Sequence, residues 1–226
     1  MDTVAISWAG GKDSSLACHR AMQAGYKVSC LINFITLDAK ASMTHGLSSE
    51  LLRTQSSAMG IPIIQKRTTW INYEQTLKNT MNELKEEGIQ GMVFGEIDLK
   101  PHKDWIEKIC RDIGFIPVLP LWGSRPDEIL SELVEEGFKM VVVSAREGHP
   151  GWEWLGEEIN RESIKKLHSL RDKFGLHMCG ENGEYHTFVL DGPIFKTRIN
   201  ILKTNKEIKQ GQWFLKIEKH SIKSKT

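Results

Sequence analysis

One stretch near the N-terminus decides the fold: Val4-Ala5-Ile6-Ser7-Trp8-Ala9-Gly10-Gly11-Lys12-Asp13-Ser14-Ser15. Its first three residues are a short β-type apolar run, and two glycines follow at a turn. A helical pattern then begins near Asp13 and ends at Gly25. A strand that passes through a glycine turn into a helix is the opening of a βαβ unit. The stretch therefore predicts an α/β protein.

The rest of the N-terminal half repeats this pattern. Further strands are expected at residues 28–35, 61–64, 92–94 and 140–143, with a helix after each of the first three. A further helix is expected from Pro126, between the helix after strand 92–94 and the strand at 140–143. Strands that alternate with helices favour an open parallel sheet with helices on both faces.

The alternation stops after Ala145. A Gly- and Pro-containing loop follows, and after one more helix come two alternating runs around residues 199–201 and 213–217. Such alternation is typical of antiparallel strands. We therefore predict two domains, 1–146 and 147–226, the second being a small α+β lobe with a basic C-terminal tail.

Composition excludes several classes of protein. The 226 residues include 30 basic and 29 acidic side chains, so the net charge is +1 and no nucleic-acid partner is expected. The four cysteines form no Cys-x-x-Cys pair, which argues against zinc ribbons and iron–sulfur clusters. The most apolar uncharged run, 28–37, is too short to cross a bilayer, and the N-terminus is not a secretory signal. A cytoplasmic protein is expected.

The glycine turn after the first strand has the properties of an anion site. Amides of Gly10 and Gly11 and the positive end of the helix dipole point at the same place. Lys12 adds a full charge, and Ser14 and Ser15 add hydroxyl donors. The spacing fits neither a Walker A loop nor a dinucleotide fingerprint. The alternative is a simple turn in which Asp13 caps the helix and Lys12 is solvated.

A second polar stretch is Cys179-Gly180-Glu181-Asn182-Gly183-Glu184-Tyr185-His186-Thr187. Its glycines would let Glu181 and Glu184 converge on a cation, an amine or a metal-bound phosphate. Tyr185 could add its ring face to such a cation. The alternative is a tight turn with solvated acids.

The first loop resembles the Ser-Gly-Gly-x-Asp-Ser loop of the PP-loop ATP pyrophosphatases, with Ala9 in place of the leading serine. Members of that superfamily grip the pyrophosphate part of ATP and transfer AMP. With the second stretch, and with Phe94-Gly95-Glu96-Ile97 and Leu119-Pro120-Leu121-Trp122, the chain resembles the diphthine–ammonia ligase family from its first strand to Pro193. His186 departs from that pattern, because many members have a glutamate there.

The resemblance implies an ATP- and Mg²⁺-dependent amide synthetase. It would adenylate the carboxylate of diphthine on elongation factor 2 and amidate it with ammonium. It implies an ATP-binding first domain, a substrate-binding second lobe, and these roles: catalytic, Lys12, Asp13, Glu181 and Glu184; nucleotide-binding, Ala9, Gly10, Gly11, Lys12, Asp13, Ser14, Ser15, His45, Gly95 and Glu96; Mg²⁺-binding, Asp13 and Glu96; substrate-binding, Trp122, Glu181, Asn182, Glu184, Tyr185, His186 and Thr187.

Three alternatives remain open. A protein of the same fold could amidate a small-molecule carboxylate, or it could bind ATP or AMP as a regulator without catalysis, which the loss of serine at Ala9 favours. A PP-loop tRNA modifier is disfavoured by the lack of a Cys-x-x-Cys pair and of a strongly basic body.

Overall fold

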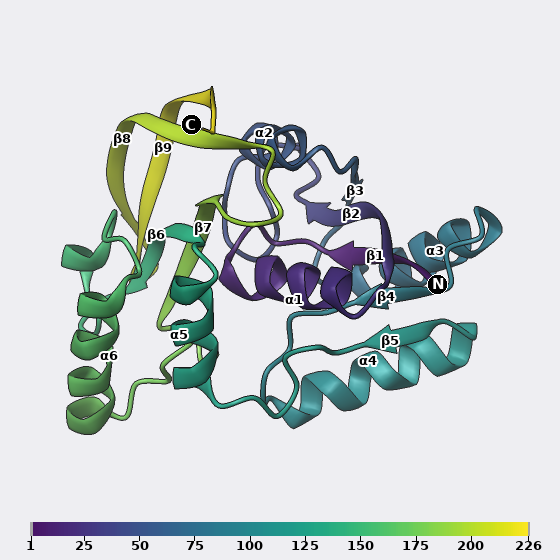
Figure 1. Cartoon of the computed structure of the whole chain (residues 1–226), viewed down its shortest axis with the longest axis horizontal. Helices are drawn as coiled ribbons and strands as arrows, with labels where there is room; N and C mark the ends of the chain where they lie inside the picture. The colour runs from purple at the N-terminus through teal and green to yellow at the C-terminus, as the bar shows by residue number, and fades with distance from the viewer. Residues whose placement is uncertain (1, 226) are drawn as a thin grey trace. The chain divides into compact units, whose positions relative to one another are not determined.

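The computed structural model describes residues 2–225, which form two compact units (Figure 1). The first unit comprises the chain up to Ala9 together with Asp13–Gly123. The second comprises Gly10–Lys12 together with the chain from Ser124 onward. The glycine turn after the first strand is thus part of the second unit by its contacts.

The first unit is built on a five-stranded parallel sheet in the order β3-β2-β1-β4-β5. Its strands are β1 (Thr3–Ser7), β2 (Lys27–Ile35), β3 (Ile63–Arg67), β4 (Gly91–Val93) and β5 (Ile116–Val118). The helices that connect them are α1 (Lys12–Gln23), α2 (Ser49–Met59), α3 (Tyr73–Glu86) and α4 (Lys100–Ile113).

Local sequence sets where these helices begin and end. The Ser48 side chain accepts a hydrogen bond from the amide of Leu51 at the start of α2, and Gly60 ends that helix in the left-handed conformation. One apolar cluster joins α3 and α4 to the strands; it includes Leu77 and Met81 of α3 and Ile106 of α4. The helices are therefore held to the sheet by their buried faces.

The strand order defines where a ligand would bind. From β1 the chain moves outward through β2 to β3, and then returns to place β4 on the other side of β1. The strand order therefore reverses between β1 and β4. In open α/β sheets ligands bind beyond the carboxyl ends of the strands at such a switch point.

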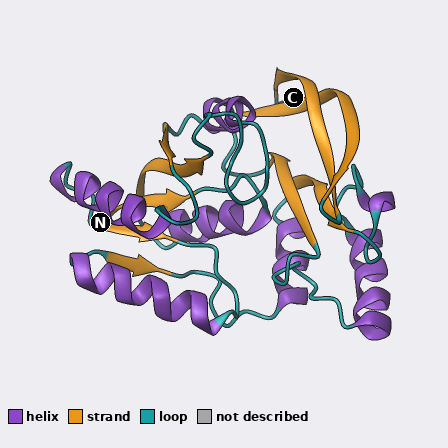
Figure 2. Cartoon of the chain, turned by 180° about the vertical axis from the view of Figure 1, so that it is seen from behind, coloured by secondary structure: helices purple, strands orange, loops and turns teal. Residues whose placement is uncertain are grey.

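The second unit contains an antiparallel sheet in the order β7-β6-β9-β8. Its strands are β6 (Lys139–Arg146), β7 (Tyr185–Asp191), β8 (Thr197–Lys209) and β9 (Gln212–Ser224). It also contains α5 (Pro126–Glu135), a short 3₁₀ helix at Trp152–Trp154 and α6 (Arg161–Phe174). Strands β8 and β9 form the long ribbon near the C-terminus in Figure 2.

The predicted fold class, a parallel α/β sheet with a small α+β lobe, is confirmed, but one strand was assigned to the wrong sheet. Residues 140–143 lie in β6, which pairs antiparallel with β7. The fifth parallel strand is instead β5, which sequence reasoning missed because it has three residues and contains Pro117. Proline is tolerated there because β5 is an edge strand.

The compact units divide after Gly123, whereas the sequence places the boundary near residue 146. The physical reason is the burial of β6, whose central residues are nearly all enclosed. That pattern is what a central parallel strand would also show. Both β6 and α5 consequently belong to the second unit.

Candidate functional site

In the first unit, the residues after β1 and after β4 lie against one another. A Cβ atom built on Gly95 would come within 2.9 Å of the carbonyl carbon of Asp13 and 3.0 Å of the amide nitrogen of Ser14. Only a residue without a side chain allows this approach of the β4 end to the start of α1. The predicted nucleotide-binding residues Gly95, Asp13 and Ser14 are therefore neighbours at the switch point.

Glu96 and Asp13 are close enough to influence each other electrostatically. Burial raises the pKa of the Glu96 carboxyl, and the neighbouring Asp13 charge raises it further. His102 acts in the opposite direction: its Nδ1 lies 3.1 Å from Glu96 Oε2. Two neighbouring carboxyl groups at a ligand-binding edge would gain from a shared cation.

In the second unit, Gly10–Lys12 is held by residues 179–189, far away in the sequence. The amide of Lys12 donates to Thr187 Oγ1 at 3.0 Å, and its ammonium donates to the carbonyl of Cys179 at 2.5 Å. The amide of Val189 donates to the carbonyl of Gly10 at 3.0 Å. Lys12 is only 2% exposed. The two polar stretches singled out in the sequence are thus in direct contact.

The carboxylate of Glu184 organises its own loop. Its Oε1 accepts from the amide of His177 at 2.9 Å and from Asn182 Nδ2 at 3.3 Å, and its Oε2 accepts from the amide of Asn182 at 3.0 Å. The side chain is 5% exposed. Buried carboxylates need such donors, so Glu184 fixes the shape of the stretch from His177 to Asn182.

Two residues that sequence reasoning missed complete this loop. Nδ1 of His177 accepts from the amides of Cys179, at 3.2 Å, and Glu181, at 3.4 Å. The Arg146 side chain donates to the carbonyl of Asn182, and its amide donates to the carbonyl of Glu184. His177 lies four residues before Glu181 in the same polar segment, which was the only available signal. Nothing near Arg146 in the sequence indicates its contact.

The two aromatic residues predicted to face substrate lie over lysines. The Lys12 ammonium is 5.4 Å from the centre of the Tyr185 ring, and the Tyr185 hydroxyl donates to the carbonyl of Met178 at 2.6 Å. In the first unit, the Lys103 ammonium is 4.8 Å from the centre of the Trp122 ring. Tyr185 therefore faces a cation, as its position suggested, but one supplied by the chain.

The remaining predicted residues are distributed over both units. In the first, Ser15 is fully buried and its hydroxyl has no hydrogen-bond partner among residues 2–225. Ala9, Asp13 and His45 are half-buried there. In the second, Glu181 is half-buried, Asn182 is exposed, and His186 lies on β7 opposite Ser144.

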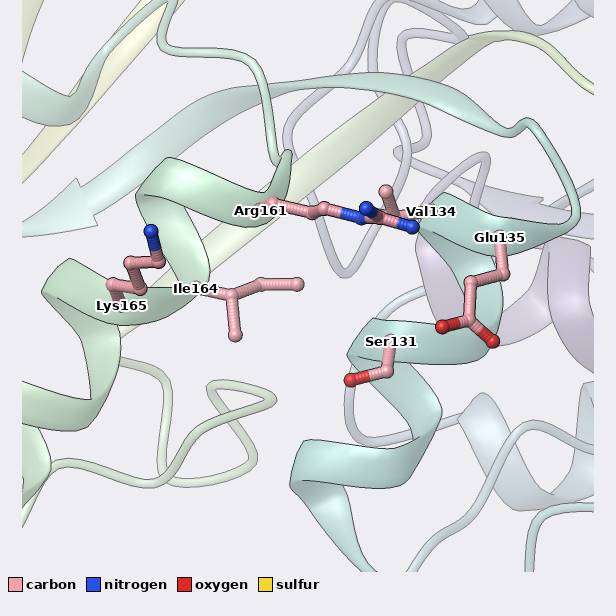
Figure 3. Close-up of a pocket in the computed structure, with 6 residues that line it drawn as sticks. All are labelled: Ser131, Val134, Glu135, Arg161, Ile164 and Lys165. Carbon is pink, nitrogen blue, oxygen red and sulfur yellow. The ribbon is translucent and has the colours of Figure 1, made fainter.

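The second unit has one hollow beside this loop and another away from it. One of about 240 Å³ brings Asn182 beside Arg171 and His177. Another, of about 260 Å³, separates α5 from α6, and Figure 3 shows Ile164 of α6 pointing into it. None of the predicted site residues lines the second hollow, so we assign it no part in the site.

Two kinds of feature are absent from residues 2–225. No group of three or more His, Cys, Asp or Glu side chains there could hold a metal ion by itself. No helix in that range is both long and apolar enough to cross a membrane.

The fold and the contact between the two loops define an α/β protein with a glycine turn at the switch point of its parallel sheet, and comparison with known families gives its membership. Residues 1–117 match the diphthamide synthase N-terminal domain, and residues 125–222 match the diphthamide synthase C-terminal domain. Because the first match alone spans more than half of the 226 residues, the chain belongs to this family.

Individual relatives agree with that membership. A diphthine–ammonia ligase of Danio rerio is 29% identical over 214 residues, covering 85% of this chain and 83% of the relative. A diphthine–ammonia ligase of Homo sapiens is 25% identical over 218 residues, covering 87% and 81%. A solved structure from Methanocaldococcus jannaschii, titled a predicted subunit of tRNA methyltransferase, aligns at 16% identity over 85% of this chain and 98% of its own, with a TM-score of 0.47. That score is too low to carry an argument.

Proposed function

We propose that this protein is an ATP-dependent diphthine–ammonia ligase that works through an acyl-adenylate and releases AMP and pyrophosphate. The observation that carries the proposal is the contact of Gly10–Lys12 with Cys179 and Thr187. It brings together the two sequence motifs on which the family resemblance rests. The names of the relatives support diphthine, a modified histidine side chain of elongation factor 2, as the acceptor.

The reaction has two steps, adenylation of the carboxylate and then amidation. A carboxylate oxygen of the acceptor attacks the α-phosphorus of ATP, and the bond from that phosphorus to the pyrophosphate oxygen breaks. Ammonium then loses a proton, its nitrogen attacks the acyl carbon, and AMP leaves with the electrons of the carbon–oxygen bond. A second proton leaves the nitrogen to give the neutral carboxamide. The protein must neutralise the departing pyrophosphate and keep water from the adenylate.

Phosphate binding is assigned to the glycine turn and the start of α1. The amides of Gly10 and Gly11, the ammonium of Lys12 and the hydroxyls of Ser14 and Ser15 are the donors. A phosphate oxygen would compete with the Cys179 carbonyl for the Lys12 ammonium. The phosphate has the advantage, because it carries a full negative charge whereas the carbonyl is only a dipole. Ala9, Gly95 and His45 are assigned to the same nucleotide.

Mg²⁺ is assigned to Asp13 and Glu96. The donor set fits, because Mg²⁺ is usually held by one or two carboxylates together with substrate phosphates. Burial raises the pKa of Glu96 most and the charge of Asp13 raises it further, and a cation bound between the two carboxyl groups would favour their ionised forms. When bound, the ion would neutralise charge on the phosphate oxygens.

Glu181 is assigned to ammonium, and Glu184 is assigned to positioning. The Glu184 carboxylate accepts three hydrogen bonds inside its loop, whereas Glu181 is half-buried at the loop surface. Asn182, His186 and Trp122 are assigned to binding the acceptor. Tyr185 and Thr187 are assigned to positioning Lys12, because the Tyr185 ring faces its ammonium and Thr187 accepts from its amide. None of the four cysteines forms a disulfide, which favours the reducing cytoplasm as the place of reaction.

The test follows the products of ATP. Purified protein is incubated with ATP, ammonium and diphthine-bearing elongation factor 2. We expect AMP and pyrophosphate only when both co-substrates are present, and a carboxamide on the factor by mass spectrometry. AMP formed with a small carboxylate but not with the factor would favour the small-molecule amide synthetase. ATP binding without turnover on any acceptor would favour a regulatory protein.

Variants of the two glutamates test the assignment within the site. Glu181→Gln should keep the wild-type unfolding free energy and lose amidation, because it removes a charge from the loop surface. Glu184→Gln should lower the unfolding free energy by about 1–3 kcal/mol, because an amide cannot accept all of the hydrogen bonds that the carboxylate accepts. Urea denaturation and the product assay separate the two. Full amidation by Glu181→Gln would contradict its role.

A further inference from the structure

The hairpin of β8 and β9 is a long ribbon with few other partners. The two strands pair along almost their whole length, from Thr197 opposite Ser224 to Lys209 opposite Gln212. Strand β6 pairs with β9 only at Gln212, Trp213 and Phe214. Most of the ribbon seen in Figure 2 is therefore two-stranded.

Cations gather on one face of the ribbon, and the other face is mainly apolar although it also carries Lys206 opposite Leu215. Residues directly opposite each other in a ladder share a face, and the faces alternate along each strand. Register shifts between Ile201 and Lys203 and between Lys203 and Thr204 reset this alternation in the middle of the ribbon. One face carries Ile199 and Leu215, both buried. The other face, which we name the basic hairpin face, consists of exposed cations: Arg198, Lys203, Lys209, Lys216, Lys219 and Lys223.

Like charges lie directly opposite each other on the basic hairpin face. Arg198 is in register with Lys223, and Lys203 is in register with Lys219. Like charges in such positions destabilise a strand pair. Lys203 is compensated by Glu218, whose Oε2 lies 2.7 Å from its Nζ. Within residues 2–225 the other five cations form no ion pair with a carboxylate.

Edge protection explains only part of this arrangement. Lysines on an edge strand prevent sheets from joining, and β8 is an edge strand. In the two-stranded part of the ribbon β9 also lacks a second partner strand, so lysines on either strand could serve this purpose. Edge protection does not, however, require cations of the two strands to lie directly opposite each other, which destabilises the pair. An acidic partner would relieve the repulsion of both rows.

The composition of the face favours a protein over a nucleic acid. Glu207 lies on the same face and Glu218 sits among its lysines. These carboxylates would repel a continuous phosphate backbone, but a protein surface can present both signs of charge. The net charge of only +1 likewise creates no long-range attraction for a polyanion.

We propose that the basic hairpin face docks an acidic surface of the folded protein that carries the acceptor side chain. This inference rests on the proposed function, since a side chain of a large protein must be held by a surface wider than the reaction site. The face would act mainly on encounter and affinity, because exposed interfacial charges change association rates more than they change chemistry.

The test reverses two charges that belong to no catalytic or nucleotide-binding group. Lys219→Glu/Lys223→Glu is compared with Lys27→Glu/Lys108→Glu, which changes the net charge equally at exposed positions of the first unit. At low salt we expect the hairpin variant to raise KM for diphthine-bearing elongation factor 2 by about tenfold with kcat unchanged. The difference from wild type should shrink as salt is added. The control should keep the wild-type KM, and ATP affinity should be unchanged in both.

Each other outcome overturns the inference and is distinct from failure of the proposed function. If wild-type protein amidates the factor and the hairpin variant does so with the same KM, the face is not a docking site. If that KM is unchanged but binding to a single-stranded RNA is lost, the partner is a nucleic acid. Aggregation of the hairpin variant with unchanged KM for its soluble fraction would assign the lysines to edge protection. If wild-type protein produces no amide with any acceptor, the proposed function itself fails.

Discussion

At the scale of single residues, the contact between Lys12 and Thr187 matters most. Lys12 is almost completely buried. Its amide donates a hydrogen bond to Thr187 and its ammonium donates one to the carbonyl of Cys179. A lysine held by a carbonyl dipole keeps its donors oriented for a stronger acceptor such as phosphate. If Lys12 binds ATP as proposed, the second loop acts on that binding through its contacts with Lys12.

Thr187→Val tests this positioning role. Valine has nearly the same shape but no acceptor, so the buried amide of Lys12 would lose its partner at a cost of about 1–3 kcal/mol. We expect ATP affinity to fall by about tenfold, measured by isothermal titration calorimetry. Thr204→Val, on the exposed hairpin, is the control and should bind ATP as wild type does. Equal ATP affinity in both variants would mean that Thr187 does not position the glycine turn.

At the scale of elements, short-range patterns were predictable and long-range partners were not. The turn from β1 into α1 follows from two glycines and a helical pattern within a dozen residues. The hydrogen bond from Lys12 to Thr187 joins residues 175 positions apart, and no local pattern specifies it. Likewise β6 has the burial of a parallel strand, and only its partner β7 makes it antiparallel.

The roles of the two loop glutamates show the same limit. Both were predicted to face a cation, because charge and spacing alone treat them alike. The difference arises when the chain folds so that the amides of His177 and Asn182 surround Glu184. The sequence can identify a polar loop that is a candidate functional site. Which glutamate organises the loop and which stays at its surface depends on which side chain the folded loop encloses.

The two glycines of this loop offer a matched pair of substitutions. Gly180 and Gly183 have φ values of +76° and +78°, so alanine would bring similar backbone strain, about 1 kcal/mol, at either position. A Cβ on Gly180 would lie 2.6 Å from the carbonyl oxygen of Tyr185, whereas one on Gly183 meets nothing closer than Arg146 at 3.5 Å. Gly180→Ala should therefore lower Tm clearly more than Gly183→Ala, measured by thermal unfolding. Equal Tm values would mean that the loop can move away from Tyr185.

At the scale of the whole molecule, charge is distributed unevenly around a neutral total. The chain carries a net charge of +1, yet the basic hairpin face holds six exposed cations. The proposed Mg²⁺ site in the first unit collects carboxyl groups instead, at Asp13 and Glu96. A near-neutral composition therefore says little about local electrostatics, and partners must be inferred from particular faces.

The reactivity of the buried cysteine thiols reports how often the folded protein opens to solvent. None of the four forms a disulfide and all are buried, and burial raises the pKa of Cys18 to about 12 and those of Cys30 and Cys110 to about 11. Because the thiolate is the reactive form, these thiols should not react with Ellman's reagent at pH 8 in the native protein. We expect essentially no colour before urea is added and four equivalents after unfolding, with the reaction rate following the unfolded fraction. Rapid reaction of one thiol in native buffer would show that its unit opens locally well below the global unfolding free energy. Cys179 is the residue to examine first in that case, because its carbonyl holds Lys12.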